Sequence, residues 1–155
     1  MIALFITFFA AVVLLFLGLN KKESSFSMLA VLALLASAVG SFCSAKGLIQ
    51  TALLESWVPL NMMHFGYVEH MFAALLSLIA ALIVYAFRKN ENIGTDQLGL
   101  MMFSLCGAYM MLSYQHIVML FLGIEVLSIP LYVLAGSNKE SLASNEASLK
   151  YFLMG

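Results

Sequence analysis

Charged residues are scarce in this chain of 155 residues. Asp, Glu, Lys and Arg together make up 10% of it, against roughly 25% in an average soluble domain. Seven basic residues stand against eight acidic ones, so the basic surface that nucleic acids require is missing and we expect no nucleic-acid partner. Hydrophobic residues account for 63% and the mean hydropathy is +1.02, which is typical of an integral membrane protein.

Cysteines and catalytic motifs are equally rare. The two cysteines, Cys43 and Cys106, lie in separate apolar segments without the close spacing of a zinc site, an iron-sulfur cluster or a redox pair. The sequence contains no phosphate-binding glycine loop, dinucleotide fingerprint or nucleophile motif. We therefore expect no catalytic residue, no metal site and no bound cofactor in this chain.

Apolar segments of membrane-spanning length are what the sequence has in abundance. About 20 apolar residues are needed for a helix to cross the roughly 30 Å of hydrocarbon in a bilayer. The pattern predicts an all-α, multi-pass transmembrane bundle of about six helices. The sixth has about 14 residues before Gly155, about 21 Å at helical rise, so we expect it to be truncated. The segments lie near residues 2–19, 27–45, 67–87, 97–114 and 116–135, and the sixth begins near Leu142.

The basic residues predict how the bundle is oriented. Lys46 stands alone in its loop, whereas the other loop lysines and the arginine fall on the opposite side. By the positive-inside rule that more basic side is cytoplasmic, which places the amino terminus outside. The first segment has no basic residue before it and no cleavage pattern after it, so we interpret it as a membrane helix and not a signal peptide. The residues on the basic side are Lys21, Lys22, Arg88, Lys89 and Lys139.

Two ionisable residues interrupt the last apolar segments. Glu125 lies in the middle of the fifth segment and Lys150 lies in the sixth. A charge at the centre of a membrane helix costs roughly 2.5 to 3.5 kcal/mol, so such residues usually face a protein interior or a hydrated path and act on ions. Each is roughly 14 to 17 Å from the turn at residues 136–141. We therefore expect the two at similar depth, where the protonation of one changes the proton affinity of the other.

Other polar residues near this pair allow two interpretations each. Pro130 kinks the helix and exposes a carbonyl that binds water, or it is a packing kink. Glu146 and Lys150 are four residues apart, so they could form an ordinary ion pair at the membrane entrance. Ser144 or Asn145 could cap the start of the sixth helix.

These motifs resemble a known family. The segments LGIEVLSIPLY (residues 122–132) and SNEASLKYFL (residues 144–153) are similar to the subunit N family of bacterial NADH-quinone oxidoreductase, respiratory complex I. The resemblance implies that Glu125 is the glutamate that modulates a lysine on a later, broken helix, and that Lys150 belongs to the same polar axis. It also implies that His116 is the polar residue that begins the fifth helix. Glu146 matches a glutamate whose role is positional.

The resemblance also implies an organisation and a function. Residues 1–95 would form an amino-terminal region of three transmembrane helices, and residues 96–155 the start of an antiporter-like helical repeat. The function would be proton translocation in the bacterial inner (plasma) membrane, coupled to quinone reduction. The partners would be other membrane-arm subunits and the lipid bilayer.

NADH, quinone, flavin and iron-sulfur clusters would be reached only through partner subunits, so we expect enzymatic activity only within a complex. Two alternatives remain open. The chain could be a subunit of a multisubunit cation/proton antiporter, or a truncated structural module that transports nothing and whose charges only lock helices together.

Overall fold

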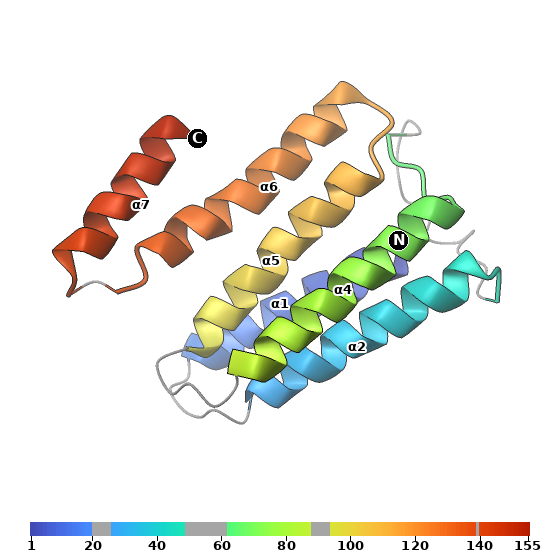
Figure 1. The fold of residues 1–155 in the computed structure, drawn as a ribbon, viewed down its shortest axis with the longest axis horizontal. Helices are drawn as coiled ribbons and strands as arrows, with labels where there is room; N and C mark the ends of the chain where they lie inside the picture. The colour runs from blue at the N-terminus through green and yellow to red at the C-terminus, as the bar shows by residue number, and fades with distance from the viewer. Residues whose placement is uncertain (20–25, 49–61, 88–93, 139) are drawn as a thin grey trace.

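The helices of this chain form an elongated bundle (Figure 1). The computed structural model describes residues 1–19, 26–48, 62–87, 94–138 and 140–155. Within these ranges the chain folds into six helices and contains no strand beyond one isolated bridge. The helices are α1 (Ile2–Leu19), α2 (Phe26–Ala45), α4 (Tyr67–Phe87), α5 (Thr95–Leu112), α6 (Ile117–Ala135) and α7 (Leu142–Met154).

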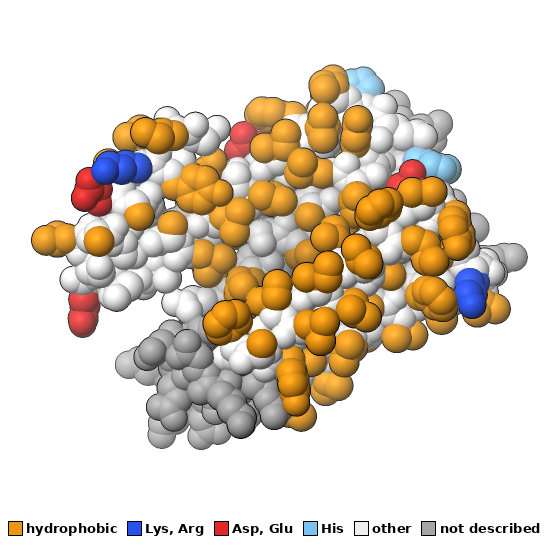
Figure 2. Space-filling view, in the orientation of Figure 1, with side chains coloured by type: hydrophobic (Ala, Val, Ile, Leu, Met, Phe, Trp, Pro, Cys, Tyr) orange, Lys and Arg blue, Asp and Glu red, His pale blue; other side chains and the backbone are white. Residues whose placement is uncertain are grey.

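The predicted all-α membrane fold is confirmed. Among the described helices, α2, α4 and α6 are long and apolar enough to cross a membrane, and α1 is a shorter apolar helix. Large hydrophobic side chains point outward along them, as expected where lipid replaces water. Figure 2 shows hydrophobic side chains spread over one face of the bundle, with the few acidic and basic side chains scattered at its two ends and over α6. The five basic residues used to orient the bundle lie outside the described ranges, so its orientation stays a prediction.

Four helices, α1, α2, α4 and α5, enclose the core. One half of this core is apolar and centres on Leu14, Leu34 and Met102. The other half surrounds Tyr109, which is fully buried together with several hydroxyl groups. The core therefore has a hydrophobic end and a polar end.

Glycines let α5 approach a helix on each side. A Cβ atom added at Gly107 would lie 2.7 Å from the carbonyl oxygen of Gly123 on α6, and one added at Gly99 would lie 3.2 Å from the carbonyl oxygen of Ala11 on α1. Both distances are too short for a normal contact, so a side chain at either position would push backbones apart. Helix α5 thus joins the four-helix bundle to α6.

The end of α5 is also tied to the start of α4. The backbone amide of His64 donates to the carbonyl of Ser113 (2.7 Å), and that of Gln115 donates to Met62 (2.9 Å). These bonds flank an antiparallel bridge between Met63 and Tyr114. Helices α5 (Thr95–Leu112) and α6 (Ile117–Ala135) are thus joined by a short connection over residues 113–116.

Candidate functional site

Glu125 lies near the middle of α6, eight residues after the helix begins at Ile117. Its side chain is half-buried, and among the described residues it forms no ion pair. Glu125 is seven residues, about two helical turns, before Tyr132, so the two share one face of α6. Tyr132 packs edge-on against Tyr151, with ring centroids 4.8 Å apart. The carboxylate therefore lies on the face of α6 that continues toward α7.

Lys150 forms the ion pair with Glu146 that the sequence left open as an alternative. Its ammonium nitrogen lies 2.6 Å from a carboxylate oxygen of Glu146, one helical turn earlier on α7. The Lys150 and Glu146 side chains are 62% and 63% exposed. Among the described residues, this ion pair takes the place of the expected coupling between Lys150 and Glu125.

Two serines of α7 set its register against α6. Ser144 donates its hydroxyl to the carbonyl of Ala135 (2.7 Å), and Ser148 donates to the carbonyl of Tyr132 (3.0 Å). Lys150, two residues after Ser148, is therefore level with about Pro130. Glu125 lies five residues further along α6, which is about 7.5 Å at helical rise.

The predicted equal depth of Glu125 and Lys150 is therefore wrong. The expectation counted both residues from the turn at 136–141, but the serine bonds place Ser144, not Ser141, level with the end of α6. The N-cap of α7 also differs from the expectation. Ser141 accepts a bond from the amide of Ser144 (3.4 Å), whereas the hydroxyl of Ser144 faces α6.

His116 lies at the start of α6 and serves as its N-cap. Its Nδ1 atom accepts a hydrogen bond from the amide of Val118 (3.4 Å), which requires this nitrogen to be unprotonated. The imidazole is exposed and is nine residues, about 13 Å along the helix, from Glu125. The structure thus assigns His116 a capping role and places it at the end of the helix that carries the glutamate.

Pro130 is buried inside α6, and the helix continues beyond it to Ala135. Because proline has no amide hydrogen, the carbonyl of Val126, four residues earlier, has no helical donor at that position. This carbonyl directly follows Glu125. The hydroxyl of Ser128 donates to the carbonyl of Glu125 itself (3.3 Å). The helix therefore has a backbone carbonyl without its helical donor directly after the glutamate.

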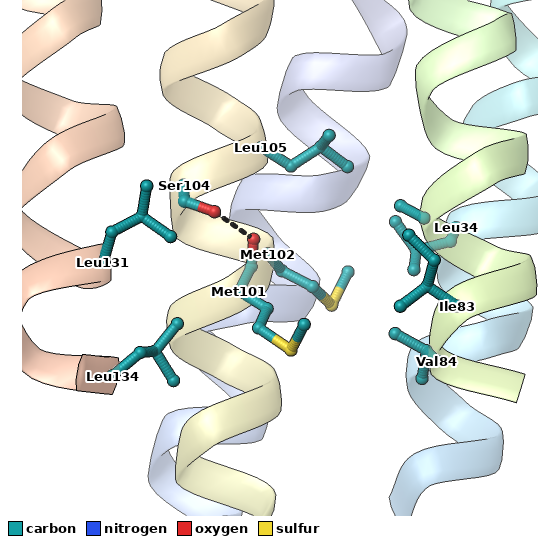
Figure 3. A pocket seen from close by; sticks show the side chains of 10 residues that line it. Leu34, Ile83, Val84, Met101, Met102, Ser104, Leu105, Leu131 and Leu134 are labelled. Atoms are coloured by element: carbon teal, nitrogen blue, oxygen red, sulfur yellow. Dashed lines mark hydrogen bonds between the residues drawn. The ribbon is translucent and has the colours of Figure 1, made fainter. Parts of the chain in front are cut away.

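A groove of about 200 Å³ lies between α4, α5 and α6 and contains no titratable side chain (Figure 3). Leu131 and Leu134 of α6 face Met101 and Met102 of α5 across it. The hydroxyl of Ser104 is satisfied by its own helix, at 2.8 Å from the carbonyl of Met101. This groove therefore has no group that could carry a proton along a pathway.

Residues 114–155 match the family model described as "NADH:quinone oxidoreductase/Mrp antiporter, TM". All six candidate residues, from His116 to Lys150, lie within this match. The chain is 33% identical over 151 residues to NADH-quinone oxidoreductase subunit N of Paramagnetospirillum magneticum, which covers 94% of this chain and 30% of the relative. The chain belongs to the subunit N family. It is accordingly a multi-pass membrane protein.

Other members of the subunit N family agree with this assignment. The subunit N of Rhodospirillum rubrum is 30% identical over 148 residues, covering 92% of this chain and 30% of the relative. That of Flavobacterium psychrophilum is 44% identical over 99 residues, covering 61% and 22%. The chain thus spans less than a third of these relatives. No solved structure is a significant match to it.

One group of residues was missed by the sequence analysis. Ser37 on α2 and Ser77 on α4 are fully buried beside Tyr109, and Ser41, one turn after Ser37, is also fully buried. The four-residue spacing of Ser37 and Ser41 puts both on one helix face, which is the signal that could have revealed them. Serine is common where membrane helices pack, so this spacing alone was easily overlooked.

Proposed function

We propose that this chain forms part of a proton-translocating membrane-arm subunit of NADH-quinone oxidoreductase. The observation that carries the proposal is the half-buried carboxylate of Glu125 in the middle of a helix long and apolar enough to span a membrane. The names of the subunit N relatives and the family match over residues 114–155 support it. A carboxylate in such surroundings costs free energy, and such residues usually occur where ions move.

Glu125 would exchange protons with groups that approach the face of α6 it shares with Tyr132. Its lack of an ion pair among the described residues leaves the carboxylate available to a cation or a proton from another part of the assembly. Binding and release of a proton there changes the local charge by one unit, which alters the proton affinity of any neighbouring ionisable group. That coupling is what the proposed relay requires.

Lys150 would take part only after leaving Glu146. The ion pair between them is largely exposed, so it is weak and easily exchanged. The long side chain of Lys150 would then extend along α7 toward the level of Glu125. In this scheme Lys150 has two positions, one paired with Glu146 and one extended toward the level of Glu125.

The remaining parts of the proposal concern the assembly. NADH oxidation and quinone reduction would take place in partner subunits, which would carry the flavin and the iron-sulfur clusters. This chain would contribute no cofactor. We place the assembly in the bacterial inner membrane, with the amino terminus of this chain outside.

The test compares two carboxylates of one hairpin in the full-length protein. Glu125→Gln removes the half-buried acid, and Glu140→Gln removes an exposed one from the turn between α6 and α7. In inverted membrane vesicles, NADH-driven acidification should fall in Glu125→Gln and stay unchanged in Glu140→Gln. Quinone reductase activity is measured in parallel. Unchanged pumping per assembled complex in Glu125→Gln would refute the proposal.

A cation/proton antiporter subunit is the second candidate, because the matching family description names both classes. The two functions differ in their energy source. Antiport would persist in vesicles that carry an imposed pH gradient and an external sodium or potassium salt, without NADH. Cation-dependent dissipation of that gradient, lost in Glu125→Gln, would favour the antiporter.

The third candidate, a structural module, is favoured by the exposed ion pair on α7. Under this interpretation Glu125→Gln combined with Lys150→Met would reduce the amount of assembled complex. The activity of each assembled complex would stay normal. Quantifying the complex on native gels separates this outcome from a loss of pumping.

A further inference from the structure

The polar side chains that the described residues bury all lie in one half of the four-helix bundle. This half contains the start of α1, the end of α2, the start of α4 and the end of α5. The opposite half buries only the apolar cluster around Leu14, Leu34 and Met102. The buried polar residues are Thr7, Ser37, Ser41, His70, Ser77 and Ser113.

Most of the hydroxyls in this polar half are satisfied by their own helix. Thr7 donates to the carbonyl of Ala3 (2.8 Å), Ser37 to that of Leu34 (2.8 Å) and Ser77 to that of Ala73 (2.9 Å). A hydroxyl has one donor and two acceptor sites. The oxygens of Ser37 and Ser77 can therefore still accept hydrogen bonds from a donor in the bundle interior.

Two hydroxyls are exceptions. Tyr109 and Ser41 are fully buried, and among the described residues neither hydroxyl has a hydrogen-bond partner of good geometry. The Tyr109 hydroxyl lies near the hydroxyls of Ser37 and Ser77, on two different helices. Ser41 follows Ser37 by one turn on the same face of α2. Two unsatisfied hydroxyls thus occur next to two oxygens that can accept.

We propose that this cluster is an internal water-binding site formed by Tyr109, Ser41, Ser37 and Ser77. Buried polar groups without a protein partner are commonly satisfied by ordered water, which makes about three hydrogen bonds to such groups. A water molecule here accepts from Tyr109 and Ser41 and donates to Ser37 or Ser77. Each hydroxyl then has a partner, and no charged group is needed.

This site is distinct from the residues of α6 and α7 and does not depend on the proposed function. It is built from α2, α4 and α5 and uses uncharged groups only. It makes one half of the bundle hydrated and leaves the other half dry.

Radiolytic labelling tests the site in the membrane-embedded, full-length protein. X-ray radiolysis of bound water produces hydroxyl radicals that oxidise the nearest side chains, which mass spectrometry then identifies. Tyr109 should be labelled although it is fully buried. Met102, only 1% exposed in the apolar half, is the control, because its thioether is more easily oxidised than a phenol. Labelling of Tyr109 at or below the level of Met102 would overturn the proposal.

A variant identifies the ligands of the water. Ser41→Ala removes one proposed ligand and should reduce the labelling of Tyr109. Ser104→Ala removes a hydroxyl that is bonded within α5 and should leave it unchanged. Thermal unfolding gives a second readout. Loss of a water-bound hydroxyl lowers the Tm, whereas loss of an unsatisfied one leaves it unchanged or raises it. An unchanged or raised Tm in Ser41→Ala, with unchanged labelling, would show that Ser41 binds no water.

Discussion

The bundle of α1, α2, α4 and α5 differs from the hairpin of α6 and α7 in which polar side chains it buries. The polar side chains that the bundle buries fully are hydroxyls with one histidine, and its carboxylates, Glu69 and Asp96, lie in the first turns of their helices without full burial. The hairpin carries carboxylates and an ammonium group, which stay half-buried or exposed. Each region contains a helix long and apolar enough to cross a membrane, namely α2 and α4 in the bundle and α6 in the hairpin.

This difference in burial arises because the carbonyl groups of a helix can accept hydrogen bonds from side chains but cannot donate them. A hydroxyl can donate to a carbonyl three or four residues earlier, as Ser113 does to Tyr109 (2.9 Å), so it can be buried with little cost. A carboxylate cannot be satisfied by these carbonyls, because both are acceptors. Burial of a charge therefore needs a partner from another element. Most buried hydroxyls of the bundle therefore find an acceptor in their own helix, whereas Glu125 is available to a partner.

The contact between the two regions gives the largest expected effect. Gly107→Ala would place a Cβ atom against the backbone of Leu127 and Gly123 on α6, which cannot move away easily. We expect the protein to lose about 1 to 3 kcal/mol of stability, as overpacked interiors do. Chemical denaturation in mild detergent measures this loss.

Gly40→Ala is the matched control for the same added methyl group. Its Cβ atom would lie 3.0 Å from a terminal carbon of Ile2, a side chain that can rotate. Stability should be unchanged or slightly raised, because alanine is the better helix former. Equal losses in both variants would mean that α5 and α6 do not depend on close backbone contact.

The register of the hairpin gives a smaller effect. Ser148→Ala removes the hydrogen bond to the carbonyl of Tyr132 and should cost about 0.5 to 1.5 kcal/mol. The distance between spin labels on Val133 and Leu149, both exposed, should become more broadly distributed. Ser104→Ala, which breaks only a bond within α5, should leave it unchanged. An unchanged distribution in Ser148→Ala would show that other contacts set the register.

The positions of the helices were predictable from the sequence because membrane thickness fixes their length. The predicted segments 67–87 and 116–135 correspond to α4 and α6 within one residue at each end. Hydrophobicity acts on whole segments, so it needs no knowledge of neighbouring helices. The same property identified Glu125 as unusual, because one carboxylate contrasts with the entire segment.

The relative position of α6 and α7 was not predictable in the same way. It depends on which serine of α7 reaches which carbonyl of α6, and Ser141, Ser144 and Ser148 are alike in sequence. The buried hydroxyl site was unpredictable for the same reason. Ser37 and Ser77 come together with Tyr109 only through the packing of α2, α4 and α5, which local patterns do not encode.

The ion pair of α7 gives the smallest expected effect. Glu146→Gln leaves Lys150 charged but removes its partner, and both side chains are largely exposed. Exposed pairs four residues apart in a helix contribute only about 0.3 to 0.5 kcal/mol, so the denaturation midpoint should hardly change. Exchange of the exposed Glu140 for Gln controls for the loss of one negative charge. A loss of stability as large as that of Gly107→Ala would mean that another part of the assembly covers this pair, and α7 would then belong with the buried region.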